Sequence, residues 1–572
     1  MSSSSVRSDE QRVEEHPKLD ELKRLRKNYF LKEKCHRHLL INNLKTLIKD
    51  WTERLPNLRD IFTRQEMDWL LEAIMYSFDQ HREIVDFFIC CGYKDEPDMD
   101  EDGKPLLRRT TPVHQIDQCS NVYCTSRYAA LQRLFNIYDK FDVNYIDESG
   151  YSHFHVACKY GLEDAVKKFL EVGQVDPNLL VPKTGDYPLH LALKNVNTTV
   201  VGLLLRSGAD PNLANRFGST ALHVLSKLNA DRFYYERISK KQCADLLEIC
   251  DEKCVPVNID ARDNEGNTPL HVALSYYGSG LLLASLLLRR GADPNSVNDK
   301  GETLLHIIAK QGLGEERIFI TIKERSQQTV RIDARDNLGR TALEWAVASC
   351  SPPAVKSLLE YGADVSGFVF PTAASYDYPT SFPVQYCSVI RLAVATGLLA
   401  IVELLETKVG QELDLGDALK VMGFFDKYKL YERVNVSITK YVDSLADPIL
   451  EQMAEKSTYM DYFKFARSYT GSRNYRSRDA CDFRLCEKVT RKFFRDWALD
   501  CFMALIHYRL PILCCNMIID QLTNKDLYYI CLAAKGQTDE QDKINVTENV
   551  LKRNNERPVG DGNAPKRLKI EC

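Results

Sequence analysis

The chain has 572 residues, of which 44% are hydrophobic, 27% are charged and 10% are aromatic, and its formal net charge at pH 7 is −4. Such a length exceeds one ordinary core, so we expect about three to five domains or one elongated array of repeats. The composition excludes a wholly disordered or fibrous chain, and the charge excludes a globally basic nucleic-acid binder.

Membrane and secretion signals are not found in the sequence. No apolar run reaches the roughly 18 residues that a membrane span needs, and the first residues, Met1–Asp9, lack the apolar core of a secretory signal. We therefore expect an intracellular protein of the nucleus, the cytoplasm or both, with no membrane partner and with nucleic acid an unlikely partner.

The N-terminal part divides into two segments. Residues 1–60 are densely charged with mixed sign, which predicts a solvated helix or disorder. Residues 61–144 contain weak copies of a helix-pair unit, with helices expected over Trp69–Met75 and Glu83–Phe88.

Cys35, His36 and His38 could ligate a metal, but no second half follows at zinc spacing, and the 18 cysteines form no regular frame. We expect no metal and no cofactor.

A repeated motif fills residues 145–366. It is clearest in Asn267–Ala273, which reads N-T-P-L-H-V-A and is followed by a leucine-rich run and by Gly291–Asn295. His155 and His190 occupy the same motif position 35 residues apart, and His223 follows after another 33. The gap of 48 residues from His223 to His271 indicates an insertion, which we expect in 229–241.

Each motif residue has a physical role. Thr268 can cap a helix with its hydroxyl, and Pro269 suits the first helical position because no N–H is needed there. Gly291 can end the second helix in a left-handed conformation. One histidine per repeat favours a structural hydrogen bond over metal binding or acid–base catalysis.

These repeats resemble the ankyrin-repeat family, whose period is about 33 residues and whose core reads T-P-L-H-x-A. The resemblance implies an all-α solenoid of helix–turn–helix units with short hairpin loops, and a docking surface for a target protein formed by the first helices and the hairpin tips. The tips could instead be merely solvated. The tip residues expected to bind the target are Tyr151, Arg216, Phe217, Glu265, Lys300 and Arg340.

The array is expected to give way to a different helical module. Residues 367–410 are assigned to a linker and a final degenerate repeat around Ile390–Leu405, and residues 411–490 to a helical connecting region. Residues 491–535 hold an apolar segment in which Leu510–Leu527 resembles the F-box pattern, a Leu-Pro pair before an apolar helix and a closing Asp-Leu. The alternative is an ordinary helix pair that caps the solenoid.

Ankyrin repeats followed by an F-box-like segment resemble the PRANC-domain family of poxviruses, insects and endosymbionts. The resemblance implies a substrate receptor whose C-terminal domain recruits a Skp-type adaptor of a cullin–RING ubiquitin ligase. Cys514–Asn516 departs from the F-box pattern, which usually has an acidic residue and aliphatic residues there. The implied adaptor-facing or core positions are Leu510, Pro511, Ile512, Met517, Ile518, Leu522, Asp526 and Leu527.

The remaining observations concern catalysis and the tail. No phosphate-binding loop, dinucleotide fingerprint, zinc-protease motif or nucleophile elbow occurs, so we do not expect an enzyme. Residues 536–572 should be a disordered tail with a basic cluster that resembles a nuclear-import signal, which adds an import receptor to the expected partners. The alternative function is a stoichiometric ankyrin scaffold or inhibitor of a signalling or transcription factor, such as a Rel-type protein, with no ligase role. The basic residues are Lys552, Arg553, Lys566, Arg567 and Lys569.

Overall fold

The computed structural model describes residues 17–30, 37–49, 51, 54–75, 78–116, 124–228, 233–275, 280–310, 322, 329–371, 388–410, 413–428, 430, 458–468 and 475–536. These residues form helices joined by turns, with isolated β-bridges such as Met99 with Pro105. The chain divides into two compact units, residues 1–273 with 282–292 and residues 274–281 with 293–572, which are described separately.

The first unit begins with two helix pairs. α1 (Pro17–Phe30) packs on α2 (Arg37–Ile48), and α3 (Arg64–Met75) packs on α4 (Phe78–Cys90). The expected helices over Trp69–Met75 and Glu83–Phe88 are present. The charged start of the chain is less solvated than predicted, because α1 buries Leu22 and Leu25 among its charged residues.

A buried polar cluster joins these pairs to the repeats that follow. The Arg109 guanidinium contacts the carboxylates of Asp68 on α3 and Asp95, the latter at 2.9 Å. The hydroxyl of Tyr138 donates to Asp68 at 2.7 Å, and that of Tyr145 donates to Asp95 at 2.6 Å. Every charge in the cluster is therefore paired, as buried charges must be.

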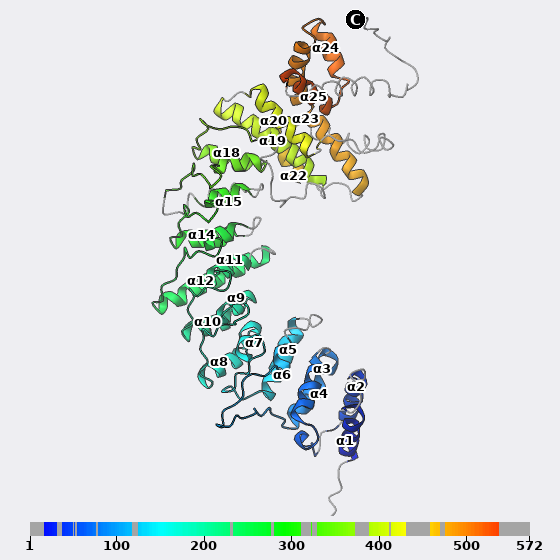
Figure 1. Cartoon of the computed structure of the whole chain (residues 1–572), viewed down its shortest axis with the longest axis vertical. Coiled ribbons are helices and arrows are strands. Elements are labelled where there is room, and N and C mark those ends of the chain that lie inside the picture. The colour runs from blue at the N-terminus through cyan, green and yellow to red at the C-terminus, as the bar shows by residue number, and fades with distance from the viewer. Residues whose placement is uncertain are drawn as a thin grey trace, which may run out of the picture. The chain divides into compact units, whose positions relative to one another are not determined.

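Helix pairs continue through the rest of the unit. α7 (His153–Tyr160), α9 (Pro188–Lys194) and α11 (Ala221–Lys227) are first helices that pack on one another in order. The second helices α8 (Glu163–Glu171), α10 (Thr198–Arg206) and α12 (Phe233–Glu252) follow them on the other side of the stack (Figure 1). The further helices of this region are α5 (Pro112–Gln115), α6 (Cys124–Ile137), α13 (Pro269–Leu274) and α14 (Leu281–Arg289).

The insertion after His223 lengthens a second helix. α12 has 20 residues, whereas α8 and α10 have nine each. Of the predicted insertion, residues 229–232 lie outside the described part of the chain, and Phe233–Lys241 form the first half of α12.

The repeat hairpins turn at an Asp or Asn that accepts two backbone N–H groups. The Asn215 side-chain oxygen accepts from Phe217 at 3.0 Å and from Ser219 at 3.1 Å. Gly218 follows with φ of +73°, and a Cβ there would lie 2.6 Å from the backbone nitrogen of Asn264 in the next hairpin. Glycine is therefore required both by the turn and by the close stacking of hairpins.

The motif histidine connects neighbouring repeats. The backbone N–H of Thr220, the N-cap of α11, donates to His223 Nδ1 at 3.2 Å. His223 Nε2 lies 2.9 Å from the carbonyl oxygen of Asn267 in the next repeat. Because Nδ1 accepts from an N–H, the neutral ring carries its proton on Nε2 and donates it to that carbonyl. The predicted structural role of the histidine is confirmed.

The second unit starts with the same helical hairpins. It contains α15 (Leu304–Lys310), α17 (Ala342–Ala348) and α18 (Pro352–Glu360). In α15, His306 Nε2 lies 3.0 Å from the Arg340 carbonyl oxygen. In α17, Glu344 replaces the histidine, and its carboxylate accepts the N–H of Thr341 at 2.7 Å.

A bundle of helices follows α18. It contains α19 (Ser388–Val409), α20 (Leu415–Lys427), α22 (Tyr459–Ser468), α23 (Tyr475–Leu505), α24 (Ile512–Ile519) and α25 (Asn524–Lys535). α19 packs on α22 and α23, and α23 packs on α24 and α25. None of the helices within the described residues is long and apolar enough to cross a membrane.

Two features of the bundle differ from the sequence expectations. The segment Ile390–Leu405, predicted as a degenerate repeat, lies within the single helix α19. Gly397 does not break this helix; a Cβ there would lie 3.1 Å from the Phe463 ring of α22, so glycine permits close packing instead. α23 runs continuously through the expected division at residues 490 and 491.

The buried histidines that connect neighbouring repeats predict that the free energy of unfolding depends on pH. Burial lowers the pKa of His114, His155 and His190 to about 4, and lowers that of His223 and His306. The unfolded state, with a histidine pKa of ~6.5, binds protons that the folded state excludes, until about pH 4 at His114, His155 and His190. The stabilisation is therefore complete above pH ~6.5 and falls as the pH drops below that value, by up to about 1.4 kcal/mol per pH unit for each histidine until its folded-state pKa is reached.

Urea unfolding at pH 7.5 and 5.5 measures this effect, and we expect a lower midpoint at pH 5.5. The control is His223→Gln, because its amide can accept from the Thr220 N–H and donate to Asn267 without titrating. The variant should lose less stability between the two pH values than the parent protein. Equal midpoints of the parent protein at both pH values would contradict the assignment of buried neutral histidines.

Candidate protein-interaction surfaces

The hairpin tips form the first surface, and the turn geometry presents their side chains outward. In the first unit, Phe217 occupies the tip of its turn and is 63% exposed. Its neighbour Arg216 is also exposed and is fixed by donating to the Lys183 carbonyl oxygen at 3.0 Å. A rigid, exposed aromatic beside an ordered arginine is the composition that concentrates binding energy in protein interfaces.

The other predicted tip residues of the first unit are held differently. The Tyr151 ring is half-buried and stacks on the His155 imidazole, with centroids 5.5 Å apart and planes 17° apart. Glu265 is exposed and accepts from the Asn267 side chain at 3.3 Å. One face of the Tyr151 ring is therefore covered by His155, whereas the Glu265 carboxylate lies in solvent.

The second unit carries the remaining predicted tip residues. Lys300 is exposed at its turn, and Arg340 lies over the Trp345 ring with its guanidinium carbon 4.7 Å from the ring centroid. The Lys310 ammonium lies 3.8 Å from the same centroid, and Trp345 Nε1 donates to Asp336 at 2.7 Å. Leu338 at this turn is 69% exposed. It lies three residues before the N-cap of α17, as Phe217 does before the N-cap of α11, and this motif position could have identified it as an exposed tip residue.

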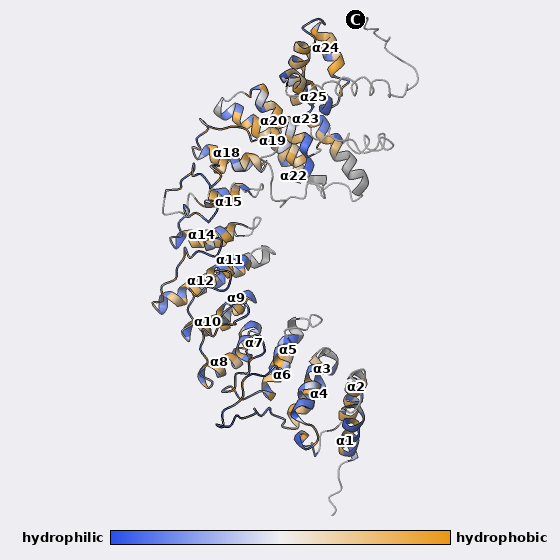
Figure 2. Ribbon diagram, in the orientation of Figure 1, coloured by the Kyte–Doolittle hydropathy of each residue, from blue (hydrophilic) through white to orange (hydrophobic). Residues whose placement is uncertain are grey.

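An apolar patch on the C-terminal bundle forms a second surface. α24 buries Cys515 and Ile519 against its own unit, and Arg491 of α23 donates to the Ile519 carbonyl oxygen at 2.6 Å. The opposite side of α24 exposes Leu513 and Met517, at 73% and 67%, and Ile512 is exposed at the first position of the helix. Figure 2 shows that most of the α24 ribbon is coloured as hydrophobic. α24 is therefore apolar on two sides and packs on its own chain with one of them.

The turn before α24 extends this patch. His507 and Tyr508 both adopt left-handed backbone conformations, with φ of +54° and +56°. Two consecutive non-glycine residues there store strain of the order of 1 kcal/mol or more each. The turn exposes the Tyr508 ring, and Leu505 at the end of α23 is also exposed. We call Leu505, Tyr508, Ile512, Leu513 and Met517 the α24 patch.

The predicted adaptor positions divide between the patch and the core. Ile512 and Met517 belong to the patch, Leu510 and Ile518 are half-buried, and Pro511 is exposed as the N-cap of α24. Leu522 and Leu527 are buried in their own unit.

Asp526 is also buried and has a local partner. It accepts from the Thr523 N–H at 2.9 Å and from its hydroxyl at 2.6 Å, and so caps α25. The Asp-Leu end of the F-box-like pattern is therefore structural. Leu505, Leu513 and Tyr508, which the sequence analysis did not select, are the residues that complete the exposed face.

Two further predictions concern a metal site and a nuclear-import signal. Among the described residues, no group of three or more His, Cys, Asp or Glu side chains is arranged to hold a metal ion. Cys35 and His36 lie outside the described residues, as do the five basic residues of the predicted nuclear-import signal.

Comparison with known proteins supports the repeat assignment. The family model for ankyrin repeats (3 copies) matches residues 122–215, 154–234, 189–283 and 276–367. The mouse B-cell lymphoma 3 protein homolog is 28% identical over 226 residues, 38% of this chain and 46% of its own length. The mouse NF-kappa-B inhibitor delta is 28% identical over 254 residues, 38% of this chain and 70% of its length.

An enzyme is also among the similar proteins. The phosphocholine transferase AnkX of Legionella pneumophila is 29% identical over 153 residues, which are 27% of this chain and 15% of that protein. The chain matches less than half the length of this protein and of the B-cell lymphoma 3 homolog. With capped helix pairs, glycine turns and bridging histidines in the matched segment, residues 122–367 of this chain are ankyrin repeats.

Proposed function

We propose that this chain is a non-enzymatic substrate receptor of a cullin–RING ubiquitin ligase. The ankyrin repeats bind a target protein through the hairpin tips, and the α24 patch binds a Skp-type adaptor. The receptor performs no chemistry itself and raises the effective concentration of the target near a ubiquitin-loaded enzyme on another subunit.

The exposed α24 patch is the observation that carries the adaptor role. Soluble proteins bury large apolar side chains, and a contiguous exposed group of them marks an interaction site. Leu513, Met517 and Tyr508 are each more than 60% exposed, while the other side of the same short helix is buried. A helix that packs on its own unit with one apolar side and exposes another suits a hydrophobic groove on a partner.

The framework behind the patch is rigid enough to present it. Arg495 of α23 pairs with Asp520 at 2.9 Å and donates to the Asn516 side chain at 3.0 Å. Asn524 at the start of α25 is buried and donates to the Glu487 carbonyl oxygen at 3.0 Å. These contacts tie the middle and the C-terminal end of α24, and the start of α25, to α23, so little conformational entropy would be lost there on binding.

The deciding experiment changes only exposed residues of the patch. Leu513→Asp with Met517→Asp should abolish co-purification of a Skp-type adaptor with the full chain, because two charges would enter an apolar contact. The fold should persist, since neither side chain is buried. The matched control is Phe217→Asp with Val172→Asp, two exposed apolar residues of the first unit, which should leave adaptor capture unchanged.

Failure of the unchanged chain to capture an adaptor would contradict the ligase role.

The same variants address the second candidate function, a stoichiometric scaffold or inhibitor of a Rel-type transcription factor, which the similarity to the NF-kappa-B inhibitor delta favours. An inhibitor acts by occupancy, so Leu513→Asp with Met517→Asp would leave inhibition intact. Deletion of residues 491–535 is a poorer test, because it would cut α23 and expose the bundle core.

We further propose that the chain acts in the nucleus as well as the cytoplasm. The support is the basic tail sequence, with Lys552 and Arg553 upstream of Lys566, Arg567 and Lys569. A fusion of a fluorescent protein to residues 537–572 should accumulate in nuclei, and Lys566→Ala with Arg567→Ala should abolish this. Equal distribution of both fusions between nucleus and cytoplasm would contradict an import signal.

A further inference from the structure

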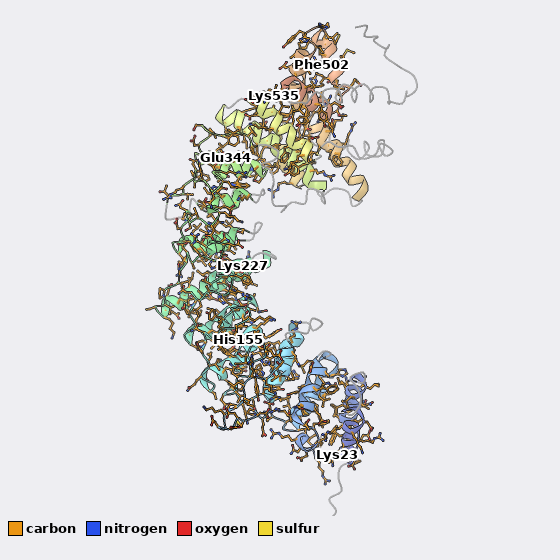
Figure 3. The ribbon with its side chains drawn as sticks, viewed as in Figure 1. Lys23, His155, Lys227, Glu344, Phe502 and Lys535 are labelled. Carbon is orange, nitrogen blue, oxygen red and sulfur yellow. The ribbon has the colours of Figure 1, made fainter. Side chains whose placement is uncertain are left out.

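The connection between α4 and α5 is longer than the later connections of the first unit. It comprises residues 91–111, a length of 21, whereas the later connections from a second helix to a first helix have 14 to 16 residues. These later connections are residues 138–152, 172–187, 207–220 and 253–268. The extra length is used for a hairpin, residues 96–108, which we call the insertion hairpin. Figure 3 labels Lys23 on α1 and His155 on α7, and the insertion hairpin lies between these two helices in the chain.

Backbone pairing sets the two faces of the insertion hairpin. Met99 and Pro105 form an antiparallel bridge, and the turn between them contains Gly103 with φ of +74°. Side chains alternate between the two faces of paired strands, so Leu107, two residues after Pro105, lies on the same face as Met99. Leu106 lies on the opposite face.

The face that carries Met99, Pro105 and Leu107 is apolar and open to solvent. Met99 is 57% exposed, Leu107 is 38% exposed and Pro105 is half-buried. Single exposed apolar residues are common on soluble proteins, whereas adjacent ones on one face mark an interaction surface. Because Pro105 has no N–H to donate, this strand is poorly suited to pairing with a further strand, and recognition of the face depends on its side chains.

The turn of the insertion hairpin carries unpaired negative charge. Asp100, Glu101 and Asp102 are exposed, and none of them has a cationic partner within the described part of the chain. Asp100 Oδ1 accepts the N–H groups of Asp102 at 3.0 Å and of Lys104 at 2.8 Å, which fixes the shape of the turn. Charge complementarity therefore favours a partner with cationic side chains.

Two arginines hold the base of the insertion hairpin. Arg59 donates to the Lys94 carbonyl oxygen at 2.8 Å and pairs with the Glu96 carboxylate. Arg64 of α3 donates to the Glu96 carbonyl oxygen at 3.2 Å and pairs with Asp98. These pairs balance the acidic residues at the base, so the net negative charge is confined to the turn. A hairpin fixed in this way loses little conformational entropy on binding.

A simpler explanation covers the charge of the turn alone. Acidic residues in an exposed turn are usually solvated, and they favour solubility. Solubility does not account for the apolar face beside them, because an exposed apolar face works against it. The juxtaposition of the two features is what points to a partner.

We propose that the insertion hairpin is a third protein-interaction surface, which binds a partner segment with apolar residues followed directly by a cluster of lysines or arginines. The apolar residues of the segment cover Met99 and Leu107, and its basic cluster pairs with the turn at Glu101 and Asp102. The inference goes beyond the proposed function, because neither the predicted tip residues nor the α24 patch includes this hairpin.

The probe is a fluorescein-labelled block peptide, Leu-Ser-Leu-Ser-Lys-Lys-Lys. A matched scrambled peptide contains the same residues in the order Lys-Leu-Ser-Lys-Ser-Leu-Lys. Fluorescence anisotropy with the full chain at low ionic strength should show at least tenfold tighter binding of the block peptide. Added salt should weaken that binding, because the charges of the turn are exposed.

Two variants separate the apolar contribution from the charge. Met99→Ser with Leu107→Ser should weaken binding of the block peptide at least tenfold at every salt concentration. Glu101→Gln with Asp102→Asn should weaken it at low salt and remove most of its salt dependence. Thermal unfolding checks that both variants are folded. If the apolar variant fails to fold, the charge variant still tests the proposal, since its two side chains are exposed.

The control variant is Val172→Ser with Leu180→Ser, two exposed apolar residues of the same unit, and it should weaken binding less than twofold. Three outcomes would overturn the proposal: equal binding of the block and scrambled peptides, equal losses in the apolar variant and the control, or an unchanged salt dependence in the charge variant. None of these readouts involves the α24 patch, so a failure of adaptor capture and a failure of the insertion hairpin are distinguishable.

Discussion

The fold of the repeats depends on one side chain that serves two repeats. The motif histidine accepts the N–H at the start of its own helix and donates to a carbonyl of the next repeat, as His155 does to Leu179 at 2.7 Å. The same pair of contacts is made by His114, His223 and His306. Both groups would otherwise be buried without partners, which costs more than the bonds gain. The ring is therefore held neutral and in one tautomer, and the orientation of every hairpin is set by the helix before it.

This constraint explains why the binding surfaces lie where they do. The histidine, the N-cap and the turn glycine fix the backbone of each repeat, so the chain is free to vary only at the hairpin tips and in the length of the connections. Phe217 occupies such a tip, and the insertion hairpin lengthens one connection. Variation at such positions changes the partner without changing the stack.

The bundle at the C-terminal end is held together by side-chain packing between helices and not by a repeated motif. Two of its helices, α19 with 22 residues and α23 with 31, are longer than the described helices of the repeats, and α23 alone contacts α19, α20, α24 and α25. A core of this kind needs apolar residues on several sides of each helix, and α24 has more of them than its own unit covers. The proposed adaptor would bury the exposed apolar side chains of the α24 patch. The strained turn at His507 and Tyr508 lies directly before α24 and exposes the Tyr508 ring.

The sequence predicted the repeats well because the motif is local. Thr268, Pro269 and His271 act within one turn of helix, so their roles could be assigned from spacing alone. The bundle was harder, because the burial of Asp526 and Leu527 and the exposure of Leu513 depend on which side of α24 and α25 meets α23. Gly397 illustrates the limit of sequence analysis. The sequence suggested a repeat around it, whereas the structure places it inside the continuous helix α19. Its lack of a side chain permits close packing against Phe463, a residue distant in sequence.

Nitrogen-15 NMR of the chain labelled only at histidine tests the central claim most directly. At pH 6.5 the account predicts that His114, His155, His190, His223 and His306 have an unprotonated Nδ1 and a protonated Nε2, with no exchange toward the charged ring. Substitution of each histidine in turn assigns its signals. A charged ring, or a ring protonated at Nδ1, at any of these five histidines would contradict the bridge between repeats.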